Sequence, residues 1–140
     1  FDPSGKVKGA ECFHCHSGPN FTNDDYFNNG LDSDLEMKDD GRMKVTKNSL
    51  DKAKFLTPSL RNIALTGPYM HDGRLKTIEE VINHYNQNVK KSSTVDILMQ
   101  YNLQAGGLGL SSADIADLKA FLLTLSDESL KSNTAFSDPN

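Results

Sequence analysis

The sequence contains no tryptophan, and only two of its 140 residues are cysteines. Aromatic residues make up 8% of the chain and hydrophobic residues 36%, which predicts a thin core for one domain of this length. We therefore expect that something other than side chains helps to fill the interior.

An excess of positive charge is also missing. The formal net charge is -4 and the pI is about 5.5, so the chain offers no basic face to nucleic acid or to anionic lipid. Small molecules and protein partners are the expected ligands. No apolar run approaches the roughly 20 residues that a membrane span needs. The first residues lack a signal-peptide pattern and the chain starts at Phe1 without Met, which suggests a processed or trimmed chain.

Strand-like alternation does not persist over more than a few residues, whereas helical patterns are found in three segments. In the first, TPSLRNIAL at 57–65, Thr57 is placed as an N-cap and Pro58 at the first helical position. In the second, TIEEVINHYN, Thr77 and Glu80 form a capping box and the apolar residues share one face. These patterns predict a short helix over 57–65 and a second helix from Thr77.

A third helix is predicted to open at Ser111, with Asp114 in capping position. Its apolar stripe would be buried against a core: Ile115, Leu118, Phe121, Leu122 and Leu125. The other long stretches are expected to be loop or extended chain: 17–54, 87–110 with one turn at 95–100, and 126–140. The predicted fold class is mainly α with long loops, in a single domain over residues 1–140.

Both cysteines lie in one short stretch, AECFHCHSGPNFTN, where Cys12, Cys15 and His16 form the C-x-x-C-H pattern of c-type haem attachment. On one helical turn, two thiols three residues apart can form thioethers with the two vinyl groups at one edge of a porphyrin. His16 would then project to the iron from the same turn. His14 has no geometric duty in this pattern and is expected to be an exposed spacer. One covalently bound haem c would also supply the missing core.

Two other interpretations of the motif stay open. A disulfide between the cysteines would leave His16 without a role. A structural zinc site would need two further ligands at spacings that match no common zinc finger; the available histidines are His14, His71 and His84.

Three longer segments follow one another in an order that a known family shares. They are CFHCHSGPNFTN, FLTPSLRNIALTGPYMHDGRLKTIEEVINHYN and LSSADIADLKAFLLTLSD, and together they cover most of the chain. From Cys12 onward the sequence resembles the C-terminal haem domain of the bacterial di-haem cytochrome c peroxidase and MauG family. The resemblance implies a cytochrome c-like helical domain wrapped around its haem.

The resemblance also implies a function. Family members have two haem domains; hydrogen peroxide reacts at the N-terminal haem, and the C-terminal haem relays electrons to it. A single haem motif suggests the C-terminal half of such an oxidoreductase, with an N-terminal haem domain and a small redox donor protein as partners, in the periplasm. The 140 residues alone are then not expected to turn over peroxide. The alternative is a stand-alone mono-haem electron carrier without catalysis.

The iron ligand opposite His16 is left open between two residues. Tyr85 matches, by its distance from TGPYMHDG, the position where the peroxidases have an axial Met and MauG-type enzymes an axial Tyr, although it is also placed as a core aromatic. Met99 is the rival, in a predicted loop before the last helix, as in simple electron-transfer cytochromes. His84 would point roughly 100° away from Tyr85 on the same helix and is expected to be solvated.

Further site residues follow from the same resemblance. Met70 and His71 precede the expected ligand helix, and the resemblance implies for His71 a role in electron or proton transfer rather than iron ligation. A family calcium site between the two domains would use backbone carbonyls of Thr66 and Pro68, a suitable donor type for this cation. Without the other domain, that calcium site is expected to be weak or empty.

Two arginines are candidates for binding the haem propionates. Arg61 and Arg74 can each recognise a carboxylate through two parallel hydrogen bonds. Ordinary surface salt bridges are the alternative for both residues.

Overall fold

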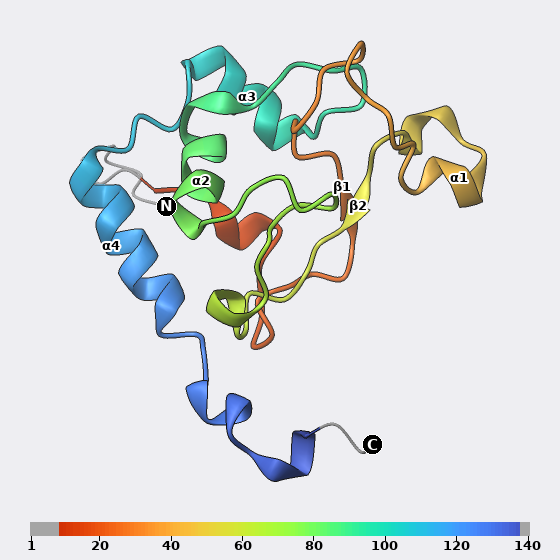
Figure 1. The fold of residues 1–140 in the computed structure, drawn as a ribbon. Helices are drawn as coiled ribbons and strands as arrows, with labels where there is room; N and C mark the ends of the chain where they lie inside the picture. Colours follow the sequence, from red (N-terminus) through yellow and green to blue (C-terminus); the bar gives the residue numbers. More distant parts are fainter. Residues whose placement is uncertain (1–8, 138–140) are drawn as a thin grey trace.

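The computed structural model of the protein describes residues 9–137. They form a helix-rich structure with a small antiparallel sheet (Figure 1). The elements are α1 (Met43–Thr46), α2 (Ile78–Asn83), α3 (Ile97–Ala105), α4 (Ser112–Leu123), β1 (Tyr26–Phe27) and β2 (Phe55–Leu56). Shorter pieces are 3-10 turns at Cys12–His14, Ser49–Asp51, Ile63–Leu65, Glu128–Lys131 and Thr134–Phe136, and a π-helical turn, His84–Asn88, that continues α2.

Figure 1 shows α2 near the middle of the molecule and α3 above it, with α4 along one side and α1 at the opposite side. The two strands lie between the central helices and α1, and they pair Tyr26 with Leu56 and Phe27 with Phe55. The chain after α4 leads away from the rest of the molecule. None of the helices within residues 9–137 has the length and apolar character of a membrane span.

The second and third predicted helices are confirmed, together with their capping boxes. The Thr77 hydroxyl accepts from the backbone nitrogen of Glu80 at 3.2 Å, and the Glu80 carboxylate accepts from that of Thr77 at 2.9 Å. Ser111 and Asp114 make the same reciprocal pair at the start of α4. Local sequence alone specifies both starts, because each box satisfies backbone donors that a helix leaves unpaired.

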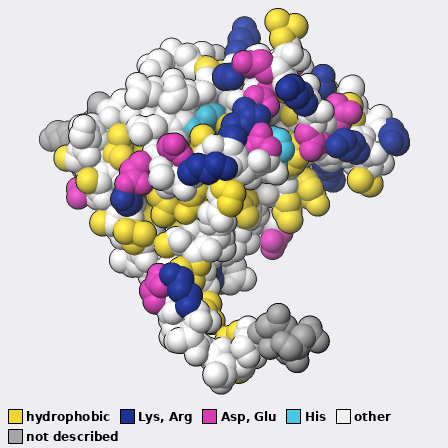
Figure 2. Space-filling model, in the orientation of Figure 1, with side chains coloured by type: hydrophobic (Ala, Val, Ile, Leu, Met, Phe, Trp, Pro, Cys, Tyr) yellow, Lys and Arg dark blue, Asp and Glu magenta, His cyan; other side chains and the backbone are white. Residues whose placement is uncertain are grey.

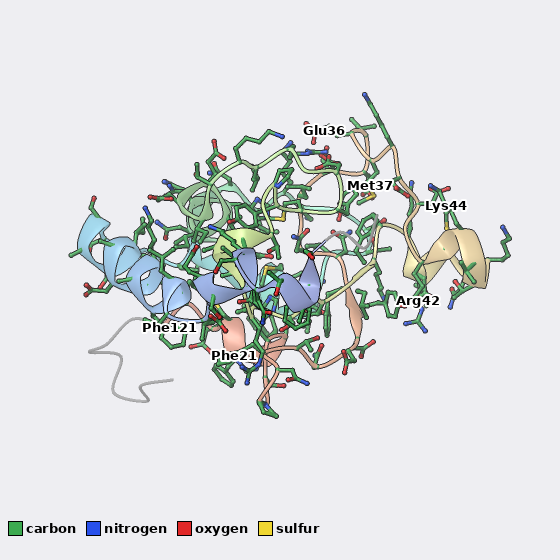
Figure 3. All side chains as sticks on the ribbon, turned by 60° about the horizontal axis from the view of Figure 1, so that its bottom comes forward. Phe21, Glu36, Met37, Arg42, Lys44 and Phe121 are labelled. Carbon is green, nitrogen blue, oxygen red and sulfur yellow. The ribbon has the colours of Figure 1, made fainter. Side chains whose placement is uncertain are left out.

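The core is small and lies between α2 and α4. Ile78, Ile82 and Leu122 form its buried centre, and partly buried residues pack around them: Leu60, Ile63, Ala64, Tyr69, Leu110, Ile115, Leu118 and Leu125. Phe121 was expected in this stripe, but it is 50% exposed and makes an edge contact with Phe21, with ring centroids 6.5 Å apart (Figure 3). No side chain within residues 9–137 is less than 2% exposed, so the predicted thin core is confirmed.

The predicted helix over 57–65 is wrong. Only Ile63–Leu65 forms a 3-10 turn, and Thr57 is a buried loop residue instead of a cap. Its backbone N–H donates to the carbonyl of Asp25 at 2.9 Å, and its own carbonyl accepts from the Thr22 hydroxyl at 2.7 Å. These bonds to a distant segment replace the intrahelical bonds that the local pattern favoured.

The prediction of loop over 87–110 is also wrong in part, because this segment contains α3. The Asp96 carboxylate caps the helix by accepting from the Leu98 nitrogen at 2.9 Å, and Gly106 ends it with a φ of 76°. Met99 therefore lies on a helix and not in a loop. In the predicted extended tail, two 3-10 turns form instead, at Glu128–Lys131 and Thr134–Phe136.

Candidate functional site

The C-x-x-C-H motif forms one tight turn. Cys12–His14 is a 3-10 turn, and the backbone nitrogens of Cys15 and His16 both donate to the carbonyl of Cys12, at 3.2 and 2.8 Å. Glu11 precedes the turn with a φ of 55°. The two sulfurs and the imidazole therefore start from the same turn, as the haem attachment pattern requires.

The two thiols of the motif are not bonded to each other. Both cysteines are free, Cys12 exposed and Cys15 half-buried. Protein atoms around the sulfur of Cys12 raise the pKa of its thiol, and burial raises the pKa of Cys15 to about 11. The structure has no bond between the two sulfurs, so the disulfide interpretation finds no support here.

The zinc interpretation finds no support either. Within residues 9–137, no group of three or more His, Cys, Asp or Glu side chains is arranged to hold a metal ion. Two of the histidines have other neighbours: His14 is exposed beside Glu11, and His71 is exposed beside Phe55.

His16 is held in the form that binds a metal. Its Nδ1 lies 3.1 Å from the carbonyl oxygen of Phe21; because a carbonyl can only accept, Nδ1 must donate, and the neutral ring carries its lone pair on Nε2. Burial lowers the pKa of His16, while the carbonyls of Phe21 and Pro58 oppose that shift. The imidazole is thus neutral at pH 7, with its tautomer fixed by a backbone partner, as is usual for ligating histidines.

Residues of the segment 57–61 form hydrogen bonds to the loop 17–21, which contains Phe21, the hydrogen-bond partner of His16. The Ser59 hydroxyl donates to the carbonyl of Asn20 at 2.5 Å, and the Arg61 guanidinium donates twice to the carbonyl of Pro19, at 3.0 and 2.6 Å. The loop between His16 and Phe21 is therefore fixed from outside. Arg61 was a candidate for binding a haem propionate. In the structure its guanidinium binds the backbone carbonyl of Pro19 instead.

Tyr85 lies on the π-helical turn that continues α2. The hydroxyl accepts a hydrogen bond from Asn29 Nδ2 at 3.2 Å. Burial raises the pKa of Tyr85 to about 12; the Asn29 bond opposes the shift, and negative charge on Cys12 and Cys15 adds to it. π-Helical turns are frequent at functional sites.

Met99 is half-buried on α3. This helix is joined to the π-helical turn by Asn102, whose Nδ2 donates to the carbonyl of Tyr85 at 2.6 Å. The two predicted ligands thus come from neighbouring elements, and ligation by Met99 stays a prediction.

Asn29 is a residue that the sequence patterns missed. Its Nδ2 donates to the Tyr85 hydroxyl and also to Met70 Sδ at 3.3 Å, while its backbone carbonyl is 3.1 Å from His84 Nε2. His84 was expected to be solvated, but it is only 4% exposed. The bond to Asn29 explains how a polar ring can be buried there. A single Asn in a loop gives no local signal for these contacts.

The remaining predicted residues lie apart from the motif. His71 stacks on Phe55, with ring centroids 3.8 Å apart and an interplanar angle of 8°. Arg74 donates to both carboxylate oxygens of Asp32, at 2.6 and 2.9 Å, and to Asp72 at 2.6 Å. Arg74 therefore forms the surface salt bridges that were the expected alternative to binding a haem propionate.

Thr66 and Pro68 are both exposed, in the turn that precedes β-bridge residue Tyr69. Calcium binding by their carbonyls stays a prediction.

The donor set as a whole fits one haem c. Two thiols that are not joined to each other and a neutral imidazole share one turn. Several large apolar side chains stay at least half exposed around the small core, including Phe13, Leu56 and Phe121. Figure 2 shows hydrophobic side chains along the lower part of one face, below intermingled charges of both signs. These features define a c-type haem protein.

Comparison of the sequence with known proteins shows which family of c-type haem proteins it resembles. No family model matches the chain. It is 37% identical over 124 residues to the methylamine utilization protein MauG of Methylophilus methylotrophus, covering 87% of this chain and 34% of that protein. It is 43% identical over 77 residues to the cytochrome c551 peroxidase of Nitrosomonas europaea, covering 54% of this chain and 23% of that protein.

A solved structure agrees with these relatives. A MauG-like protein associated with microbial copper homeostasis superposes with a TM-score of 0.78 at 35% identity, over 93% of this chain and 46% of that one. The chain is thus a member of the MauG and bacterial cytochrome c peroxidase family, and this kinship supports haem c as its cofactor. It spans about a third of the length of the MauG protein that it matches.

Proposed function

We propose that this chain is the haem c electron-transfer domain of a di-haem cytochrome c peroxidase or MauG-like oxidoreductase. In this function it relays electrons to a peroxide-reactive haem in an N-terminal domain outside the given sequence. The observation that carries the proposal is the single turn on which Cys12, Cys15 and His16 meet, with the His16 tautomer fixed by Phe21. The short share of the relatives' length that the chain covers supports a second domain.

Each residue of the site has a distinct task in this proposal. Cys12 and Cys15 would anchor the haem through thioethers, and His16 Nε2 would bind its iron. Tyr85 is the second proposed ligand of the iron, because its distance from TGPYMHDG in the sequence matches the position where MauG-type enzymes have an axial Tyr. The bound haem supplies one-electron ferric and ferrous chemistry. A hard phenol oxygen favours the ferric state, so this choice of ligand would keep the reduction potential low.

The surroundings of the site limit how far its ligands can move. Arg61 and Ser59 hold the loop on the His16 side, and Asn102 and Asn29 hold Tyr85 by its carbonyl and its hydroxyl. Rigid ligands suit electron transfer, because the iron can change its oxidation state with little rearrangement around it. We further propose a small redox donor protein as partner, a periplasmic location, and calcium at the carbonyls of Thr66 and Pro68.

Peroxide turnover by the full-length protein tests this function. In a Cys12→Ala/Cys15→Ala variant, the peroxide-reactive haem should still react once with hydrogen peroxide, but steady turnover with a reduced donor protein should fall at least a hundredfold. The matched control is His14→Ala, because His14 is exposed and should leave turnover unchanged. Full turnover without this haem would contradict the relay.

A second function is favoured by one observation, namely that both cysteines of the chain lie in one motif. The protein would then be a mono-haem electron carrier that docks on a redox partner and catalyses nothing. A gene whose upstream sequence encodes no second C-x-x-C-H, together with a product that does not consume peroxide, would support this function over the first.

A further inference from the structure

The side chain of Asn29 is hydrogen-bonded to one sulfur atom and one oxygen atom, which belong to two separate segments of the chain. One nitrogen, Nδ2, donates to the Tyr85 hydroxyl at 3.2 Å and to Met70 Sδ at 3.3 Å. An amide NH₂ has two hydrogens, so it can serve both acceptors at once. The sulfur is the weaker acceptor, and its bond leaves the second hydrogen directed at the phenol oxygen.

The backbone around Asn29 is fixed on both sides. Its own carbonyl is bound by the buried His84, and the preceding Asn28 donates to Ser92 and Thr94, at 3.2 and 3.0 Å. The next residue is Gly30, where an added Cβ would lie 2.6 Å from a methyl of Val89. The Asn29 amide is therefore presented from a rigid segment.

The bond to Tyr85 has a definite direction. The amide nitrogen must donate and the phenol oxygen must accept, so one lone pair of that oxygen is engaged by Asn29. A hydrogen bond to a ligand oxygen withdraws electron density from it, and an oxygen with less density is a weaker donor to ferric iron. The strength of this bond therefore affects the balance between the two iron oxidation states.

We propose that Asn29 is a positioning residue that sets the reduction potential of the haem through its hydrogen bond to the Tyr85 oxygen. This inference rests on the proposed ligation of the iron by Tyr85. The bond orients the oxygen and weakens its donation to ferric iron, and Met70 holds the amide in the required orientation. Removing the amide leaves Tyr85 in place by its backbone bond to Asn102, but makes it a stronger donor.

The test is a double-mutant cycle on the holoprotein, with spectroelectrochemical measurement of the potential of this haem. Asn29→Leu should raise the ratio of ferric to ferrous iron at a given potential about tenfold, which lowers the potential by about 59 mV for one electron. Asn29→Ala, a second variant in case the first does not fold, should shift it in the same direction. Asn29→Gln, which keeps the amide, should recover part of the shift. The control is Asn133→Leu in the tail, whose side chain only caps Ala135 there.

The same variants in a Tyr85→Phe background separate positioning from a general structural effect. If the inference holds, Asn29→Leu should leave the potential of the Tyr85→Phe protein unchanged. An equal shift in both backgrounds, or no shift in the parent although its resonance Raman spectrum shows an iron-bound phenolate, would overturn the role of Asn29 and leave Tyr85 ligation standing. A parent spectrum without a phenolate would overturn both.

Discussion

Asn102 donates a hydrogen bond to the carbonyl oxygen of Tyr85 over 2.6 Å, and this bond joins α3 to the π-helical turn. Two further bonds support the turn: Leu108 donates to the carbonyl of Asn86 at 3.0 Å, and Leu110 donates to the Asn86 side chain at 2.9 Å. The ring of Tyr85 is therefore presented by a turn that is held from a second helix and from the loop that follows it.

The proposed ligation of the iron by Tyr85 can be tested by substitution. Tyr85→Phe should remove the phenolate bands from the resonance Raman spectrum of the ferric holoprotein and raise the potential by at least about 59 mV, equal to a tenfold change in the ferric-to-ferrous ratio. Met99→Leu should leave both unchanged. A sulfur-to-iron charge-transfer band in the oxidised parent that disappears in Met99→Leu would contradict Tyr85 and assign Met99.

Gly107 allows the loop to approach the π-helical turn closely. Its φ is 108°, and an added Cβ would lie 2.0 Å from the carbonyl oxygen of Asn86. Gly107→Ala should therefore destabilise the protein by more than the roughly 1–2 kcal/mol that a positive φ costs an ordinary residue, and it should weaken the phenolate bands of Tyr85. Urea unfolding and resonance Raman spectroscopy measure the two effects.

Gly106→Ala is the matched control for Gly107. Gly106 also has a positive φ, 76°, but an added Cβ would meet nothing within 4 Å. Its replacement should cost about 1–2 kcal/mol and leave the Tyr85 bands unchanged. Equal losses of stability in both variants would show that the contact with Asn86 is unimportant.

The lowered pKa of Glu36 predicts that the stability of the fold depends on pH. Hydrogen bonds from the hydroxyl and backbone of Ser33, followed by Lys90, lower the pKa of Glu36 from 4.5 to about 2. Because the folded pKa is below the ordinary value, the carboxylate stabilises the fold above pH 4.5, and this contribution is lost as the pH falls towards 2. Glu36→Gln should therefore unfold at lower urea than the parent at pH 7, with a smaller difference at pH 3.

The cause of this shift can be tested separately. Ser33→Ala removes the hydroxyl and should raise the pKa of Glu36 towards its usual range in a carbon-detected NMR titration. An unchanged pKa in Ser33→Ala would leave two causes, namely the backbone N–H of Ser33 and Lys90, whose Nζ is 2.9 Å from the carboxylate.

The sequence predicts those parts of the fold that depend on neighbouring residues. The C-x-x-C-H turn and the two capped helices are confirmed, because their hydrogen bonds join residues a few positions apart. The segment 57–65 has an equally helical pattern, but its bonds reach loop residues some 40 positions away, which include Pro19 and Asn20. Local patterns cannot anticipate such contacts.

The candidate site also has one part that local sequence predicts and one part that it does not. Cys12, Cys15 and His16 are recognisable by spacing alone. The contacts of Asn29 with Met70, His84 and Tyr85 span 41 to 56 positions and become visible only when the chain is folded. The burial of His84 had no sequence signal for the same reason.

The proposed function requires one haem c on Cys12 and Cys15 of this chain. Intact mass spectrometry of the denatured protein, produced in cells that carry a haem c maturation system, measures this directly. We expect the mass of the chain plus one haem for the parent protein, and the chain mass alone for the Cys12→Ala/Cys15→Ala variant. A parent protein of unmodified chain mass would show that no haem is attached.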